Sequence, residues 1–195
     1  MYIVYVTLMN ANIAIALFLL AVFIFKGIFS ESARNFVPAF TITGAVAVAT
    51  GMHMAFTAPM PGSWNIAMGE PSILIGVLLL GTAWSISKSY SFAPLGVYGF
   101  GAGLVAMVVG YQVINLGLGS NPVPTGIVML VAGFPGVLSL PAAFFAKSNP
   151  GISRMIQWLA IILLVVAAGM LAYTSLNGYI GHLDSFSEFK PIYAR

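Results

Sequence analysis

Residues 13–25 read IAIALFLLAVFIF, a stretch with no polar side chain on any side. Strands of a membrane barrel alternate polar and apolar residues over about ten positions, so this run favours a helix instead. Residues 161–171, IILLVVAAGML, have the same character. Because the interior of a bilayer offers the backbone no water, spanning segments must satisfy their own hydrogen bonds. We therefore expect an all-α membrane protein.

The composition of the chain agrees with that expectation. Hydrophobic residues make up 60% of the 195 residues and charged residues only 6%, whereas a soluble domain carries about a quarter. The chain has no cysteine, which excludes disulfides, thiolate metal sites and thiol catalysis. The net charge is +3, and the basic residues are scattered at the ends of apolar runs. This distribution does not indicate nucleic-acid binding.

The charged residues divide the chain into six apolar spans, each long enough to cross a hydrocarbon core about 30 Å thick. Together the spans form one transmembrane domain over residues 1–176, which a polar tail at 177–195 follows. No basic segment precedes the first apolar run, so we do not expect a cleaved signal peptide. The predicted spans are residues 3–25, 36–58, 71–87, 94–116, 124–146 and 154–176.

Lysine and arginine in the spanning domain are confined to alternate loops. The first, third and fifth loops carry Lys26, Arg34, Lys88, Lys147 and Arg154, and the second and fourth loops carry none. Because cytoplasmic loops are enriched in basic residues, we predict six transmembrane helices arranged as three helical hairpins with their tips in the cytoplasm. Both termini are then extracytoplasmic.

Polar side chains inside the spans gather toward the outer ends. Such groups face other parts of the protein or a water-filled path, so their distribution predicts an outer vestibule above a more apolar constriction. Hydrogen bonding between helices is the alternative explanation. The polar residues of the outer half are Thr7, Asn10, Asn12, Thr50, His53, Thr57, Gln112, Asn115, Tyr173, Thr174 and Ser175, and those of the inner half are mainly Thr82, Ser85 and Tyr98.

His53 is the only histidine within a predicted span. Histidine changes its charge near neutral pH, which suggests a proton sensor or a solute contact. A packed structural role and a haem or metal ligand are the alternatives, although a bis-histidine haem site would need His182 from the tail. Glu70 precedes Pro71 at the expected start of the third span, where a carboxylate complements the helix dipole. It is also a candidate for the vestibule.

Aromatic and small residues complete the candidate pore. An aromatic constriction could form from Trp84, Phe100, Phe134 and Trp158, or each could pack or face lipid. The spacing of Gly99 and Gly103 allows helices to approach closely, within a protomer or between protomers. The predicted pore or solute-binding residues are His53, Thr50, Thr57, Glu70, Gln112, Asn115, Tyr98, Trp84 and Phe134.

No catalytic set emerges from the sequence. Phosphate-binding loops, metalloprotease spacing and a nucleophile elbow are absent. We therefore do not expect an enzyme, a resident cofactor or a metal site.

The chain resembles a family of short six-span prokaryotic membrane proteins of unknown function, which implies a prokaryotic plasma membrane as its location. The segments that carry this resemblance are Gly51–His53, Pro61–Gly62, Trp64–Asn65, Gly69–Ser72, Pro94–Tyr98 and Ile114–Gly117.

The layout is also similar, more distantly, to the proton-gated urea channels and amide transporters (the UreI/AmiS family). The short segments that carry this similarity are Pro94 with Tyr98, and Trp158–Ile162 in the sixth span. Ala93–Gly96 resembles a signature of the acetate/succinate channel family, which shares the architecture. These resemblances imply three helical hairpins around a pore in each protomer and assembly as a hexamer.

Together these features predict a passive channel or facilitator for a small, mostly uncharged solute. Urea, a short amide, ammonia and a protonated short-chain acid are the candidates, and protonation of His53 could gate the path. The alternative is an accessory subunit of a membrane redox complex that binds haem, through His53, or quinone.

Overall fold

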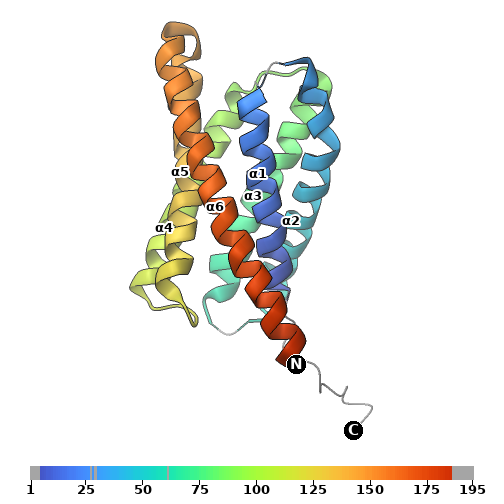
Figure 1. Cartoon of the computed structure of the whole chain (residues 1–195), viewed down its shortest axis with the longest axis vertical. Coiled ribbons are helices and arrows are strands. Elements are labelled where there is room, and N and C mark those ends of the chain that lie inside the picture. Colours follow the sequence, from blue (N-terminus) through green and yellow to red (C-terminus); the bar gives the residue numbers. More distant parts are fainter. Residues whose placement is uncertain (1–4, 27, 29, 61, 186–195) are drawn as a thin grey trace.

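The computed structural model of the chain describes residues 5–26, 28, 30–60 and 62–185. Within these residues the fold is all-helical, and six of the helices are long and apolar enough to cross a membrane, as the sequence predicts (Figure 1). A short 3-10 helix, η1, leads into the second of them. The elements are α1 (Val6–Lys26), η1 (Glu31–Phe36), α2 (Val37–Thr57), α3 (Trp64–Lys88), α4 (Ala93–Asn115), α5 (Pro122–Ser148) and α6 (Pro150–Ser185).

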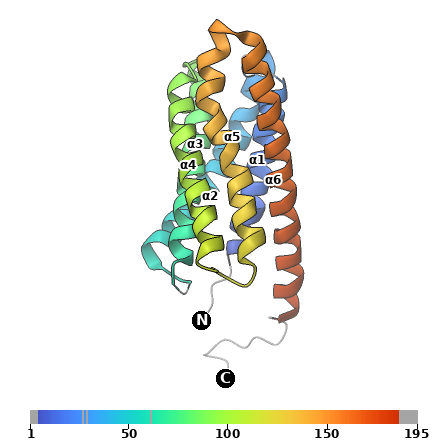
Figure 2. The same cartoon turned by 90° about the vertical axis from the view of Figure 1, so that its left-hand side faces the viewer.

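Consecutive helices run in opposite directions along the long axis of the bundle (Figures 1 and 2). The two ends of the bundle therefore differ in charge. The end at the top of Figure 1, which we call the basic end, carries Lys26, Arg34, Lys88, Lys147 and Arg154. The opposite end, which we call the polar end, carries the connections at residues 58–63 and 116–121 and the C-terminal part of α6.

Two helix boundaries, the start of α3 and the end of α6, differ from the sequence prediction by more than four residues. Helix α3 begins at Trp64, so Pro71 lies inside it rather than at its start. The preceding turn is closed by Asn65, whose Oδ1 accepts a hydrogen bond from the Met60 N–H at 2.9 Å and whose amide donates to the Gly62 carbonyl at 3.2 Å. The closed turn lets the helix start before its apolar run begins.

Helix α6 has 36 residues and continues to Ser185. At 1.5 Å per residue it is about 54 Å long, well beyond the thickness of a hydrocarbon core. The first part of the expected polar tail, residues 177–185, is therefore helical, and residues 186–195 lie outside the described part of the chain.

Helices α2 and α3 approach each other closely through glycines spaced seven residues apart on each helix. A Cβ atom added to Gly44 would lie 2.9 Å from the Gly76 carbonyl oxygen, and one added to Gly51 would lie 2.7 Å from that of Gly69. Neither position has room for a side chain, so the two backbones are in direct contact. Ser72 adds a hydrogen bond across this interface, because its hydroxyl donates to the Ala47 carbonyl at 3.0 Å.

Helices α4 and α5 repeat this arrangement with the same spacing. A Cβ added to Gly103 would lie 2.5 Å from the Gly133 carbonyl oxygen, and one added to Gly110 would lie 2.8 Å from that of Gly126. The hydroxyl of Ser139 donates to the Gly96 carbonyl across the interface at 2.7 Å. The glycines expected to permit close approach thus act within the protomer.

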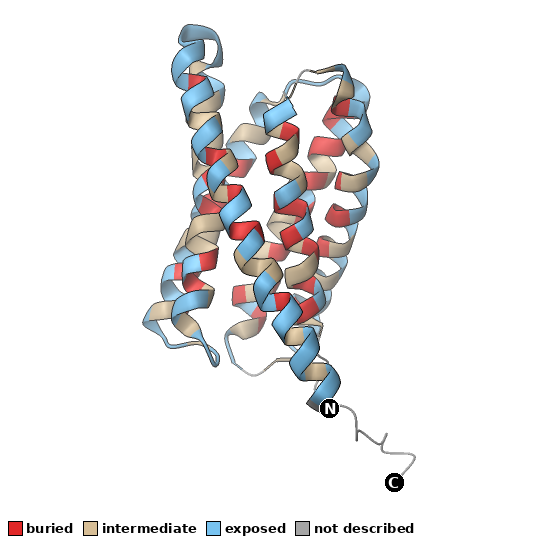
Figure 3. Ribbon diagram, viewed as in Figure 1, coloured by how far each residue is buried: buried red, intermediate tan, exposed pale blue. Residues whose placement is uncertain are grey.

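Helices α1 and α6 lie side by side, although they are the first and last of the chain (Figure 1). A cluster of small and branched residues joins them, consisting of Leu17, Ala21, Leu164, Ala167 and Ala168. The closest pairs of helices are therefore α2 with α3, α4 with α5, and α1 with α6. The predicted hairpins, in contrast, would join helices at the basic end. Figure 3 shows the buried residues on the faces that the helices turn toward one another.

Candidate functional site

A long cavity lies between α1 and α3 on one side and α4, α5 and α6 on the other. Its volume is about 1670 Å³. Its lining reaches from Ser91 and Lys147 at the basic end to Asn121 and His182 at the polar end. Helix α2 contributes only Met54 to the lining, because its inward face is taken up by contact with α3.

The central part of the cavity is lined by apolar side chains. Lys147 and His182 are the only lysine, arginine, histidine, aspartate or glutamate side chains among the described lining residues, and both lie toward the ends. An ion would lose its hydration along the apolar part without gaining a partner, which is costly. The apolar lining includes Ile13, Leu17, Leu20, Ile75, Leu79, Ala102, Ala106, Val128, Ala132, Leu138, Leu164 and Leu171.

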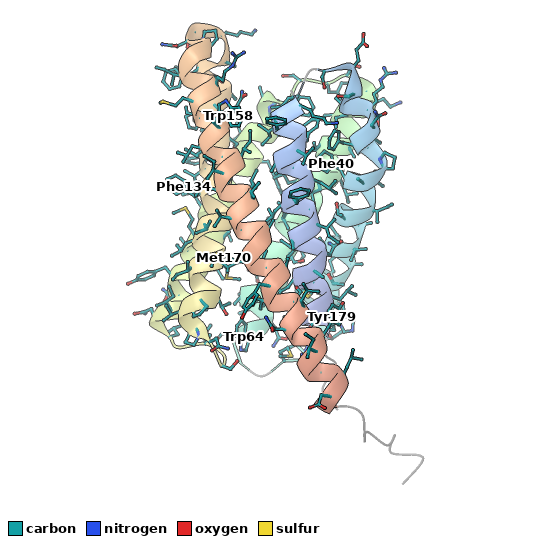
Figure 4. All side chains as sticks on the ribbon, viewed as in Figure 1. Phe40, Trp64, Phe134, Trp158, Met170 and Tyr179 are labelled. Carbon is teal, nitrogen blue, oxygen red and sulfur yellow. The ribbon has the colours of Figure 1, made fainter. Side chains whose placement is uncertain are left out.

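The polar end of the cavity is rich in hydroxyl and amide groups, contributed by Thr7, Asn10, Asn121, Thr125, Thr174 and Asn177. Trp64 from the first turn of α3 lies among them (Figure 4). Its indole packs against Gly119 in the connection between α4 and α5, and a Cβ added to Gly119 would overlap the ring. Gly119 also has a φ of 78°, which disfavours a side chain there. The connection is thereby held against α3 at the mouth of the cavity.

The basic end of the cavity carries fewer hydroxyl and amide side chains. The hydroxyl of Thr82 donates to the Leu78 carbonyl of its own helix at 2.8 Å, and Ser139 bonds to backbone as described above. Gln157 points an amide N–H at the Ser153 hydroxyl at 3.4 Å. Ser91 and Lys147 complete this end.

The predicted site residues of α2 lie outside the cavity. His53 and Thr57 are exposed on the surface of α2, and Nδ1 of His53 is 3.0 Å from the hydroxyl of Tyr5. Burial raises the pKa of Tyr5, so this hydroxyl keeps its proton at neutral pH. Thr50 is half-buried, and its hydroxyl donates to the Val46 carbonyl of its own helix at 2.7 Å. His53 therefore forms a cluster with Tyr5 and Thr57.

The other predicted site residues also lie elsewhere. Glu70 is exposed in the second turn of α3, and Gln112 and Asn115 are exposed on α4 with 3.3 Å between their side-chain amides. Tyr98, Trp84 and Phe134 are exposed as well. None of the nine residues lines the cavity. The reason is helical phase: in α3 the lining residues are Trp64, Met68, Pro71, Ser72, Ile75, Leu78, Leu79 and Thr82, and Glu70 falls between them.

Part of the outer polar set does line the cavity. Thr7, Asn10, Tyr173 and Thr174 line its polar end, and Thr82 lines its basic half. Residues that the sequence interpretation missed are Trp64, Asn121, Thr125 and Asn177. Their place in the sequence could have predicted them, since each lies in or near the part of a helix at the polar end of the bundle.

The described residues contain no group of three or more histidine, aspartate or glutamate side chains placed to hold a metal ion. The carboxylate of Glu70 and the imidazole of His53 each lie on an outer surface of the bundle. The cavity is therefore the feature of this fold with the strongest bearing on function.

Six helices that are long and apolar enough to cross a membrane surround a large, partly open cavity, the architecture expected of a polytopic membrane protein. The chain belongs to the DUF981 family, whose model is described as a protein of unknown function and matches residues 1–185. No curated protein and no solved structure matches the chain, so neither comparison shows the similarity to urea, amide or acetate/succinate channels.

Proposed function

We propose that the protein is a passive facilitator that carries a small, mostly uncharged solute through the cavity of each protomer. The observation that carries this proposal is that a cavity of about 1670 Å³ has lining residues at both ends of a bundle of membrane-spanning length. A solute would enter among the hydroxyl and amide groups of the polar end. It would then cross the apolar centre and leave past Ser91 and Lys147.

The lining supports a preference for uncharged solutes. Selectivity in such paths comes from pore diameter and from the donors and acceptors along the wall. The apolar centre penalises ions through desolvation, whereas a molecule such as ammonia, urea or a protonated short-chain acid loses far less. The hydroxyls and amides of Thr7, Asn10 and Asn177 are neutral groups that can replace water around such a solute at the mouth.

Membrane orientation and assembly are part of the same proposal. The positive residues of the basic end favour a cytoplasmic location for that end, with both termini outside, in the plasma membrane of a prokaryotic cell. The resemblance in layout to the urea/amide channels favours a homo-oligomer, with a hexamer as the first candidate. Chemical cross-linking in native membranes would give a ladder that ends at the oligomer size.

The proposal is tested by solute flux in proteoliposomes. Stopped-flow light scattering would follow urea, ammonia and acetate at two pH values, with protein-free liposomes as the baseline. We expect at least one of these uncharged species to cross faster than the baseline, and sodium and chloride not to. Flux equal to the baseline for every uncharged solute would contradict the proposal.

Gating by His53 is a separate proposal, because His53 reaches the cavity only indirectly. Its partner Tyr5 directly precedes Val6 and Thr7, which line the polar mouth. Protonation would leave Nδ1 of His53 only as a donor to the Tyr5 oxygen, so this contact would change wherever Tyr5 donates to neutral His53. Flux that responds to pH in the natural chain but not in His53→Ala would support gating, and a response to pH that is the same in both would exclude it.

The apolar centre also favours a second function, in which the cavity holds the prenyl chain of a quinone as part of a membrane redox complex. Extraction of the purified protein with organic solvent, followed by an ultraviolet spectrum before and after borohydride reduction, would reveal a quinone. The same sample tests the haem alternative at His53, since haem would give a Soret band.

A further inference from the structure

A second, smaller pocket opens between α1 and α6 near the basic end. Its volume is about 320 Å³, and its lining is Ile24, Phe25, Arg154, Gln157, Trp158 and Ile161. Nothing in the proposed solute path accounts for Arg154, Phe25 or Trp158, none of which lines the main cavity. The pocket therefore needs an explanation of its own.

The walls of this pocket are ordered by contacts on both helices. The rings of Phe25 and Trp158 meet edge to face with their centroids 5.7 Å apart, a geometry that aromatic pairs favour. Toward the polar end, the packed cluster of Leu17, Ala21 and Leu164 closes the gap between α1 and α6. Behind the pocket, Ser153 fixes the start of α6 by donating to the Ala142 carbonyl of α5 at 2.9 Å.

The charge of the pocket is positive. Arg154 is exposed, and no ion pair with a carboxylate is found for it in the described part of the chain. The basic end as a whole carries five basic residues, and Glu31 is the one acidic residue among its described residues. A guanidinium binds a phosphate through two parallel hydrogen bonds, so Arg154 is free to take up a phosphate group from outside the described part of the chain.

The remaining lining indicates what the anion is attached to. Trp158 is 49% exposed and stands one turn of helix from Arg154, so its indole sits where aromatic rings mark the boundary between headgroups and acyl chains. Ile24 and Ile161 offer an apolar wall below it. A polar head with a hydrocarbon chain matches this sequence of charged, amphipathic and apolar groups, whereas a free phosphate would use only the first.

We propose that this pocket binds an anionic phospholipid of the leaflet at the basic end, with its phosphate on Arg154 and the start of an acyl chain against Ile24 and Ile161. Gln157 supplies an amide beside the phosphate. Because Ile24 and Gln157 also line the main cavity, the bound lipid lies against two side chains that the pocket and the cavity share. The proposal does not depend on what the cavity conducts.

Fluorescence quenching by brominated lipids tests this assignment. A Trp64→Phe, Trp84→Phe chain keeps Trp158 as its single tryptophan and would be reconstituted with a minor fraction of brominated phosphatidylglycerol or brominated phosphatidylcholine. We expect about fivefold enrichment of the anionic lipid beside Trp158, the size that one arginine contributes at an anionic surface. Arg154→Gln should reduce the two lipids to equal quenching, and Arg154→Lys should retain part of the preference.

Arg34→Gln is the matched control, because Arg34 is an exposed basic residue at the same end but outside the pocket. It should keep the preference. Equal quenching by both lipids in the Trp158-only chain, or an equal loss in Arg34→Gln and Arg154→Gln, would overturn the site. Displacement of the brominated anionic lipid by millimolar inorganic phosphate would overturn the lipid assignment in favour of a free phosphate. If Arg154→Gln does not fold, native mass spectrometry of the natural chain with each lipid replaces this test. The chain should then retain phosphatidylglycerol in preference to phosphatidylcholine.

Discussion

The interfaces within the glycine-contact pairs α2–α3 and α4–α5 are built from side chains of a different size than the interface between these two pairs. Within α2–α3 and α4–α5, glycines at seven-residue intervals leave no room for even a Cβ atom. Between α3 on one side and α4 and α5 on the other, isoleucine, leucine and methionine side chains line a cavity of about 1670 Å³. The size of the side chain at each contact thus determines where this bundle is closed and where it is open.

Three consecutive residues of α4 lie on the outer surface, in the cavity wall and at the contact with α5. Gly101 faces outward with nothing within 4 Å of an added Cβ, Ala102 lines the cavity, and Gly103 meets the backbone of α5 at the edge of the cavity. Since successive residues of a helix are about 100° apart, one turn presents a free surface, an open space and a closed contact. Substitutions at these three positions separate the roles of each region.

The largest effect is expected where the closed contact is forced open. Gly103→Val would place its Cβ 2.5 Å from the Gly133 carbonyl oxygen, and overpacking of this kind costs about 1–3 kcal/mol or more. We expect loss of monodisperse protein on size-exclusion chromatography in detergent and a lower unfolding temperature. Gly101→Val, two residues away, should behave as the natural chain does. Equal loss in both variants would show that glycine matters here for another reason.

The next effect concerns the open space. Ala102→Trp would fill part of the cavity, so we expect solute flux to fall to near the liposome baseline while the protein stays folded. Gly101→Trp places the same side chain on the outer face and should leave flux nearly unchanged. If Ala102→Trp conducts as well as Gly101→Trp does, the cavity is not the path.

A substitution that widens the polar mouth of the cavity is expected to raise solute flux. Trp64→Ala removes the indole that packs on Gly119, so the polar mouth should widen and flux of the larger candidate solutes should rise severalfold. Trp84→Ala, which removes an exposed tryptophan outside the cavity, is the control. Unchanged flux in Trp64→Ala would mean that the narrowest point lies deeper, in the apolar centre.

The smallest effect is expected from the hydrogen bond that Ser72 makes across the closed interface. Ser72→Ala removes its bond to the Ala47 carbonyl and should lower the free energy of unfolding by about 1 kcal/mol. Ser87→Ala is a matched control, because the Ser87 hydroxyl bonds to its own helix at Ala83. Denaturant titration of both variants would measure the difference, and an equal loss would contradict a role in joining the helices.

The six helices could be predicted from the sequence because their signal is local. Apolar runs bounded by charges identify spans without reference to neighbours, and most predicted ends fall within a few residues of the observed ones. The start of α3 is an exception. It depends on the Asn65 side chain closing a turn onto Met60 and Gly62, a contact that neither hydropathy nor proline placement reveals.

The cavity could be predicted only in part, because its lining depends on how neighbouring helices are rotated. Helical spacing places His53 and Thr57 on one face of α2, but it does not say whether that face meets α3, lipid or open space. Thr50 shows a further difficulty, since its hydroxyl is taken by the Val46 carbonyl of its own helix. The glycines of α4 and α5 could have predicted the rotation of these two helices, because their close contact determines which faces are left to line the cavity.

Cysteine labelling shows whether water and small solutes can enter the cavity. An apolar cavity can stay dry, so its size alone does not establish a path. The chain has no natural cysteine, which allows Ala102→Cys and Ala132→Cys in the lining to be compared with Leu104→Cys on the outer face of α4. We expect a small, water-soluble thiol reagent to label both cavity positions and to spare Leu104→Cys in liposomes. Protection of both cavity positions would contradict it.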